Sequence, residues 1–163
     1  MFTVPNALSF LRLFMVPVVV TLLLGGSDGI AAAFFVLAAA TDFLDGRLAR
    51  RTGPTRIGRI LDPVADRLML SSVAVVLAIR GLLPVWAVAI LVGRDLLALV
   101  GSLVVGSKIG VNRVGKAATA VLMGAVALVV IRPGVVGEVM FYAGFGLSIV
   151  AGLMYLRSLR RIL

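Results

Sequence analysis

Four aspartates fall within 25 positions of this chain, which has only seven acidic residues in all. Asp42 and Asp45 are three residues apart, and Asp62 and Asp66 are four apart. Residues at these spacings share one face of a helix, so each pair presents two carboxylates to the same side. Four carboxylates held close together repel one another unless cations neutralise them. The aspartates are therefore candidate metal ligands.

The surrounding residue types narrow the choice of metal and substrate. The chain contains no histidine and no cysteine, so its ligands are mainly carboxylate oxygens, which suit Mg²⁺ or Mn²⁺ better than zinc. Two such ions about 4 Å apart neutralise a phosphoanhydride and activate its attacking and leaving oxygens. Arg50 begins a run of guanidinium groups suited to phosphate, with Arg51, Arg56 and Arg59. We expect two metal ions and a phosphate-bearing lipid substrate.

Each feature taken alone has a simpler interpretation. One Asp–Arg pair in a membrane helix is usually a buried ion pair, and a run of arginines is usually a topology signal. Two aspartate pairs at helical spacing, with the arginines between them, favour a metal- and phosphate-binding site over a buried ion pair or a topology signal.

The elements that position these residues are expected to be membrane helices. Of the 163 residues, 61% are hydrophobic, and the mean hydropathy is +1.17, which leaves too little polar surface for a soluble domain. A crossing takes about 20 apolar residues, so the length permits roughly six crossings in one membrane domain over residues 1–163. The net charge of +9 lies in short stretches between apolar runs, which fits membrane lipids as partners and not nucleic acid.

Six apolar segments predict an all-α integral membrane bundle of six transmembrane helices, at about 5–24, 30–49, 60–79, 84–105, 114–131 and 136–156. The first lacks a basic start and a cleavage site, so it is expected to be a retained helix. Lys and Arg concentrate in the connections after the second and fourth segments and in the tail, whereas the opposite connections hold Arg80 and Arg132. By the positive-inside rule both termini are cytoplasmic. We expect a multi-pass protein of the cell membrane whose active site faces the cytoplasm.

The connection between the second and third segments is about ten residues long, so these helices are expected to be antiparallel neighbours. Both carboxylate pairs then lie near the cytoplasmic ends of their helices and converge in one cavity below the lipid headgroups. Glycines in and around the fourth and sixth segments predict close helix packing: Gly93, Gly101, Gly106, Gly144, Gly146 and Gly152.

The aspartates belong to a longer pattern that resembles the signature of the CDP-alcohol phosphatidyltransferase family. The pattern reads Asp42-x-x-Asp45-Gly46-x-x-Ala49-Arg50, then Gly58-x-x-x-Asp62-x-x-x-Asp66. The resemblance implies that the aspartates bind two metal ions and that Asp66 also acts as the base that deprotonates the acceptor hydroxyl.

The same resemblance implies roles for the other signature positions. Gly46, Ala49 and Gly58 would be small enough for close approach of the cytidine nucleotide, and Arg50 would hold its diphosphate. The donor would be CDP-diacylglycerol, the leaving group CMP, and the assembly a homodimer.

Three further segments, 5–12, 93–95 and 115–119, resemble the phosphatidylglycerophosphate synthases and the CDP-diacylglycerol-dependent cardiolipin synthases of this family. Arg94, Arg113 and Lys116 would form a cationic pocket for an acceptor that carries a phosphate. Arg94 has an equally simple interpretation as a partner of packed groups, and Arg113 and Lys116 as topology charges. Arg12 is either an anchor or a phosphate contact.

The leading hypothesis is transfer of a phosphatidyl group to glycerol 3-phosphate, which gives phosphatidylglycerophosphate. The alternative within the class is a cardiolipin synthase that uses phosphatidylglycerol. A cation transporter is an alternative of another class, but it would need acidic residues spread along a path through the membrane. A non-catalytic scaffold would need no carboxylate cluster.

Overall fold

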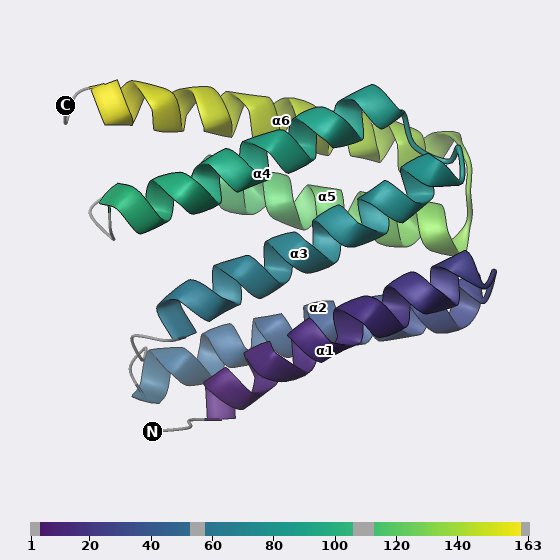
Figure 1. Cartoon of the computed structure of the whole chain (residues 1–163), viewed down its shortest axis with the longest axis horizontal. Coiled ribbons are helices and arrows are strands. Elements are labelled where there is room, and N and C mark those ends of the chain that lie inside the picture. The colour runs from purple at the N-terminus through teal and green to yellow at the C-terminus, as the bar shows by residue number, and fades with distance from the viewer. Residues whose placement is uncertain (1–3, 53–57, 106–112, 161–163) are drawn as a thin grey trace. The chain divides into compact units, whose positions relative to one another are not determined.

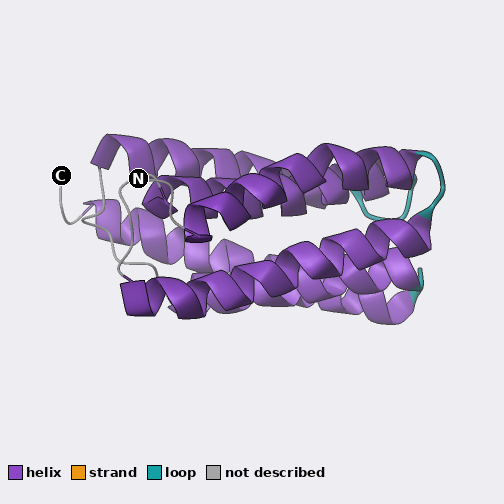
Figure 2. Cartoon of the chain, turned by 90° about the horizontal axis from the view of Figure 1, so that it is seen from below, coloured by secondary structure: helices purple, strands orange, loops and turns teal. Residues whose placement is uncertain are grey.

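The computed structural model describes residues 4–52, 58–105 and 113–160, which are almost entirely helical (Figure 1). Within these residues there are six helices: α1 Val4–Leu24, α2 Asp28–Thr52, α3 Gly58–Ile79, α4 Val85–Val105, α5 Arg113–Ile131 and α6 Val135–Arg160. Short turns join α1 to α2, α3 to α4 and α5 to α6 (Figure 2). The predicted all-helical fold class is confirmed for this part of the chain.

The helices belong to two compact units. The first, Met1–Leu77, contains α1, α2 and nearly all of α3, and the second, Ala78–Leu163, contains the end of α3 with α4, α5 and α6. The assignment of residues 1–163 to a single domain stays a prediction.

The turn between α1 and α2 shows why the second helix starts earlier than the hydropathy indicated. Gly26 has φ 76°, and the N–H groups of Ser27 and Gly26 donate to the carbonyls of Leu22 and Leu23, which is the hydrogen-bond pattern of a Schellman motif. The carbonyl of Ser27 then accepts from the N–H of Ala31 at 2.9 Å. Because Ser27 starts the helix and an acidic residue follows it in the first turn, α2 begins at Asp28 rather than at residue 30.

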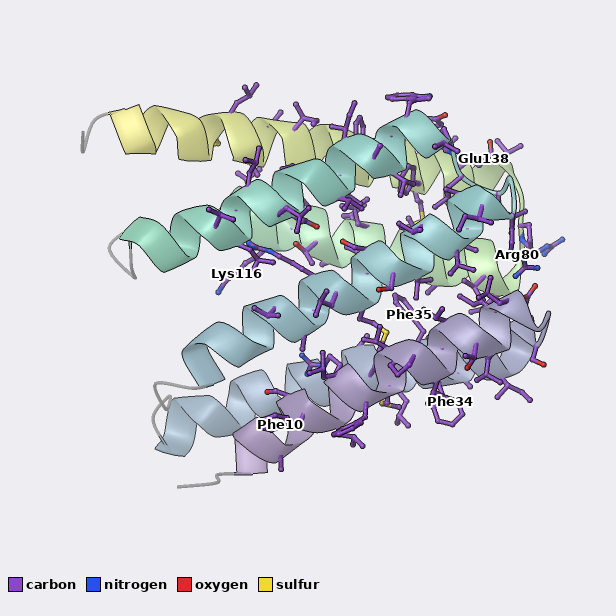
Figure 3. The ribbon with its side chains drawn as sticks, in the orientation of Figure 1. Phe10, Phe34, Phe35, Arg80, Lys116 and Glu138 are labelled. Atoms are coloured by element: carbon purple, nitrogen blue, oxygen red, sulfur yellow. The ribbon has the colours of Figure 1, made fainter. Side chains whose placement is uncertain are left out.

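In the first unit, α1 and α2 pack against each other as an antiparallel hairpin (Figure 1). The buried face of α1 includes Met15, Val19 and Leu23, at the spacing of one helical stripe. On α2, Phe35 is buried while its neighbour Phe34 is exposed on a different face (Figure 3). Each of these two helices therefore has one buried face and one exposed face.

In the second unit, α5 and α6 pack closely because α6 carries glycine at the contact. A Cβ placed on Gly144 would lie 2.9 Å from Cγ of Leu122, and one on Gly137 would lie 2.7 Å from Cγ2 of Val129. The prediction of close packing is thus confirmed at Gly144. It is wrong at Gly93 and Gly146, where an added Cβ would meet no described atom within 4 Å.

Both units expose large apolar side chains, including Phe14, Leu37, Ile79, Leu97, Val135 and Leu153. Extensive apolar exposure marks a surface that meets lipid or another protein. Over the described residues, two helical stretches are long and apolar enough to cross a membrane, Val114–Ile131 and Val135–Met154. Shorter apolar stretches lie at Ser9–Leu24 and Asp28–Thr41. By length and composition these are features of a membrane protein, while six spans and the orientation of the termini stay predictions.

Candidate active site

The aspartate signature lies on two helices of the first unit. Asp42 and Asp45 fall in the C-terminal half of α2, and Asp62 and Asp66 fall in the first three turns of α3. Figure 1 shows the C-terminal end of α2 and the N-terminal end of α3 at the same end of this unit. The helical assignment required by the spacing argument is therefore confirmed.

Asp66 is the signature aspartate whose side chain the structure describes. The side chains of the other predicted site residues in this region lie outside the described residues: Asp42, Asp45, Gly46, Ala49, Arg50, Gly58 and Asp62. Their convergence in one cavity, and their roles toward metal and nucleotide, stay predictions.

The first helix supplies a cation to this region. Nη1 of Arg12 donates a hydrogen bond to Oδ1 of Asp66, and the two side chains form an ion pair between α1 and α3. The Arg12 side chain is 1% exposed, whereas the Asp66 side chain is 22% exposed. The guanidinium is thus enclosed by protein, and the carboxylate has one side that is partly open.

The sequence placed Arg12 and Asp66 in the same site but missed their contact. Ser9, which precedes Arg12 by three residues on α1, is also buried. The signal available was that Ser9 and Arg12 interrupt an apolar helix. A buried charge is costly without a partner, so Arg12 required an acidic partner on another helix.

The predicted acceptor residues lie in the second unit. Nη1 of Arg94, on α4, donates a hydrogen bond to Oγ of Ser148 on α6 and lies 3.3 Å from Oδ1 of Asp95. Pairing with packed groups was one of the two interpretations of Arg94, and the structure confirms that pairing. Its role in acceptor binding stays a prediction.

Lys116 lies in the first turn of α5 and is exposed. Figure 3 shows it away from Arg80 and Glu138, which lie near the turns at the opposite end of this unit. The side chain of Arg113 lies outside the described residues. A shared pocket of Arg94, Arg113 and Lys116 therefore stays a prediction.

The chemistry of the four predicted aspartate ligands indicates which metal ions they suit. Among the side chains that the structure describes, no group of three or more His, Cys, Asp or Glu lies together. Three of the four predicted ligands are outside that set. An all-carboxylate set at helical spacing fits Mg²⁺ or Mn²⁺, since these hard cations take oxygen ligands.

Comparison with known proteins places the chain in a family. The family model for CDP-alcohol phosphatidyltransferase matches residues 2–150. The chain is 39% identical to a cardiolipin synthase (CMP-forming) of Streptomyces coelicolor, over 98% of this chain and 84% of the relative. It is 39% identical to a putative cardiolipin synthase of Mycobacterium tuberculosis, over 72% of this chain and 59% of the relative.

A CDP-diacylglycerol--glycerol-3-phosphate 3-phosphatidyltransferase of Bacillus subtilis is 29% identical, over 73% of this chain and 72% of the relative. The chain belongs to the CDP-alcohol phosphatidyltransferase family. It is accordingly a transferase of phospholipid biosynthesis, and the resemblance seen in the signature is confirmed. The family is generally dependent on divalent metal, and nothing in these comparisons supports a cation transporter.

Proposed function

We propose that this chain transfers the phosphatidyl group of CDP-diacylglycerol to an anionic, glycerol-bearing acceptor and releases CMP. The observation that carries the proposal is the family match over residues 2–150, which includes the whole signature from Asp42 to Asp66.

Two acceptors have support from relatives. The relative with 39% identity and nearly full coverage of the chain is named as a CMP-forming cardiolipin synthase, which favours phosphatidylglycerol. The Bacillus subtilis relative, at 29% identity, favours glycerol 3-phosphate, the acceptor that the sequence put first. We take phosphatidylglycerol as the first candidate because identity and coverage are both greater, and glycerol 3-phosphate as the second.

The chemistry is a displacement at phosphorus. The acceptor hydroxyl oxygen forms a bond to the phosphorus that carries the diacylglycerol, and the bond from that phosphorus to the oxygen shared with CMP breaks. CMP leaves with the shared oxygen, and the carboxylate of Asp66 takes up the hydroxyl proton. Because Asp66 is partly open while its arginine partner is buried, it can meet a substrate on its open side.

The other signature residues bind the donor in this proposal. Asp42, Asp45, Asp62 and Asp66 would hold two Mg²⁺ or Mn²⁺ ions, which when bound neutralise the diphosphate charge. Gly46, Ala49 and Gly58 leave room for the cytidine nucleotide, and Arg50 grips the diphosphate through its fork of N–H donors. Arg94, Arg113 and Lys116 attract the phosphate of the acceptor.

The proposed setting is a six-span protein of the cell membrane, with both termini and the active site on the cytoplasmic side. Helices of 19 to 26 residues support this, since they extend about 28–39 Å against a hydrocarbon core of about 30 Å. The basic connections after α2 and α4 support the orientation. A single catalytic domain over residues 1–163, acting as a homodimer, completes the proposal.

An acceptor panel tests the proposal. The purified full chain is supplied with CDP-diacylglycerol, Mg²⁺ or Mn²⁺, and phosphatidylglycerol, glycerol 3-phosphate, serine or inositol in separate reactions. We expect CMP release with phosphatidylglycerol and cardiolipin as the lipid product by mass spectrometry. Asp66→Asn serves as the inactive control, and we expect it to lose nearly all transfer while it stays folded. Folded, metal-supplied protein that releases no CMP with any acceptor would disprove the proposed function.

A further inference from the structure

We infer that Arg12 is a positioning residue: its guanidinium holds the carboxylate of Asp66 in the orientation in which that carboxylate accepts the acceptor's proton. The inference rests on the proposed function, because it takes Asp66 as the base. In this inference Arg12 does not contact the acceptor directly. Direct contact with a phosphate was one of the two interpretations of Arg12 from the sequence.

The first support is the enclosure of the cation. Arg12 is 1% exposed and is the largest fully buried side chain in the described part of the chain. A group that binds a substrate's phosphate directly must present N–H donors to the space that the substrate enters. The Arg12 side chain does not meet this requirement, because it is buried, whereas the Asp66 side chain is 22% exposed.

The second support is the pattern of the buried stripe on α1. Going toward the C-terminus the stripe is apolar, with Met15, Val19 and Leu23. It becomes polar at Ser9 and Arg12, where α1 meets Asp66. An apolar residue the size of Met15 would suffice for packing, so the change in character follows the position of the carboxylate.

The third support is energetic. Replacement of a buried ion pair by well-packed apolar residues is often neutral or stabilising, so such a pair is poor support for stability as its purpose. Ionisable residues within membrane helices are costly and are retained for function by default. A planar guanidinium with fixed N–H directions restrains a carboxylate better than an ammonium group does. These properties suit a group that orients a base.

Steady-state kinetics on full-length variants test the inference. We expect Arg12→Met to lower kcat about a hundredfold, the size of effect that misplacement of a reacting group by about 1 Å produces. The apparent KM values for CDP-diacylglycerol and for the acceptor should change little. Arg12→Lys should recover part of the loss and remain about tenfold below the unmodified chain, because it keeps the charge and loses the fork.

Met15→Ala is the matched control, since it removes buried side-chain atoms from the same stripe without touching a charge. It should lower the unfolding temperature and leave kcat per folded molecule within about twofold, because it keeps both partners of the Arg12–Asp66 ion pair. A Met15→Ala kcat that falls as far as that of Arg12→Met would show a general packing effect and overturn the inference.

The remaining outcomes are also decisive. A rise in acceptor KM at unchanged kcat would make Arg12 a direct acceptor contact and overturn the inference alone. If Arg12→Met does not fold, Arg12→Lys decides, and a kcat equal to that of the unmodified chain overturns the inference. An unmodified chain that is folded, supplied with metal and inactive toward every acceptor would instead disprove the proposed function, and this inference with it.

Discussion

Arg94 in α4 donates a hydrogen bond to the hydroxyl of Ser148 in α6, 54 positions later in the chain. Ser148 is fully buried. Asp95, which follows Arg94 in α4, is 5% exposed, and its Oδ1 lies 3.3 Å from Nη1 of Arg94. A Cβ on Gly152 would lie 3.8 Å from Cγ of Arg94, so α6 passes close along the arginine side chain. The guanidinium is therefore held between its own helix and α6.

Ser148→Ala should reveal whether this arrangement serves the acceptor. The substitution removes an acceptor of the Arg94 hydrogen bond, so it should lower the free energy of unfolding by about 1–3 kcal/mol. If Arg94 attracts the acceptor's phosphate, the apparent KM for the acceptor should also rise while the KM for CDP-diacylglycerol stays constant. Chemical denaturation and acceptor titration measure the two effects.

Thr21→Val is the control for that experiment. Thr21 is exposed on α1, and its hydroxyl donates to the Pro17 carbonyl within the same helix. Its replacement should change the free energy of unfolding by no more than about 0.5 kcal/mol, as is usual for surface substitutions. An acceptor KM that is the same for Ser148→Ala and the unmodified chain would argue against Arg94 as an acceptor residue.

Arg50→Lys tests the donor site. The change keeps the positive charge and loses the bidentate fork, so binding of CDP-diacylglycerol should weaken by about 1–3 kcal/mol. Competition by a non-reactive donor analogue, or the apparent donor KM, measures the loss. Arg51→Lys provides the comparison, because Arg51 is adjacent in the last turn of α2 and is not a signature position. A donor affinity of Arg50→Lys equal to that of the unmodified chain would leave Arg50 without a donor role.

The helices were predictable because apolar runs and Gly or Pro punctuation are local signals. The exact start of α2 was not, since it depends on the hydrogen bonds that Gly26 and Ser27 make across the turn. The Arg12–Asp66 pair was beyond sequence reasoning for a related reason. The partners are 54 positions apart, and only the rotation of α1 about its axis decides which residue faces α3.

The glycines show the same limit. A small residue in a membrane helix predicts close packing in general, but the neighbouring helix decides which glycine lies at the contact. Gly144 faces Leu122, whereas Gly146 lies two residues further on the other side of α6 and is exposed. Spacing within one helix cannot distinguish the two without the position of α5.

Gly144→Ala should destabilise the protein and Gly146→Ala should not. The added Cβ at Gly144 would lie 2.9 Å from Cγ and 3.1 Å from the backbone N of Leu122, so α5 and α6 would have to separate. Overpacking of this kind costs about 1–3 kcal/mol. At Gly146 no described atom lies within 4 Å of the added Cβ, and alanine is the better helix former by up to about 1 kcal/mol. Thermal unfolding of both variants measures the difference, and equal shifts would contradict the α5–α6 contact.

Trp86 allows the position of the bilayer to be measured. It is the single tryptophan of the chain, lies one residue inside α4 and is 56% exposed. Its ring stacks on Tyr142 at a centroid distance of 6.4 Å and meets Phe145 edge-on at 5.7 Å, so α4 and α6 share an aromatic cluster. Trp and Tyr collect at membrane–water interfaces, where an apolar ring and a polar atom are both accommodated.

We therefore expect the fluorescence of Trp86 in reconstituted vesicles to be quenched more by lipids brominated near the headgroup than by lipids brominated near the chain end. The matched probe is the double variant Trp86→Phe/Phe14→Trp, because Phe14 is exposed at the middle of α1. A tryptophan at that position should show the opposite order of quenching, since the centre of a spanning helix lies near the bilayer midplane. If Trp86 is quenched as deeply as the probe in α1, then α4 does not begin at the membrane surface and the six-span arrangement is wrong.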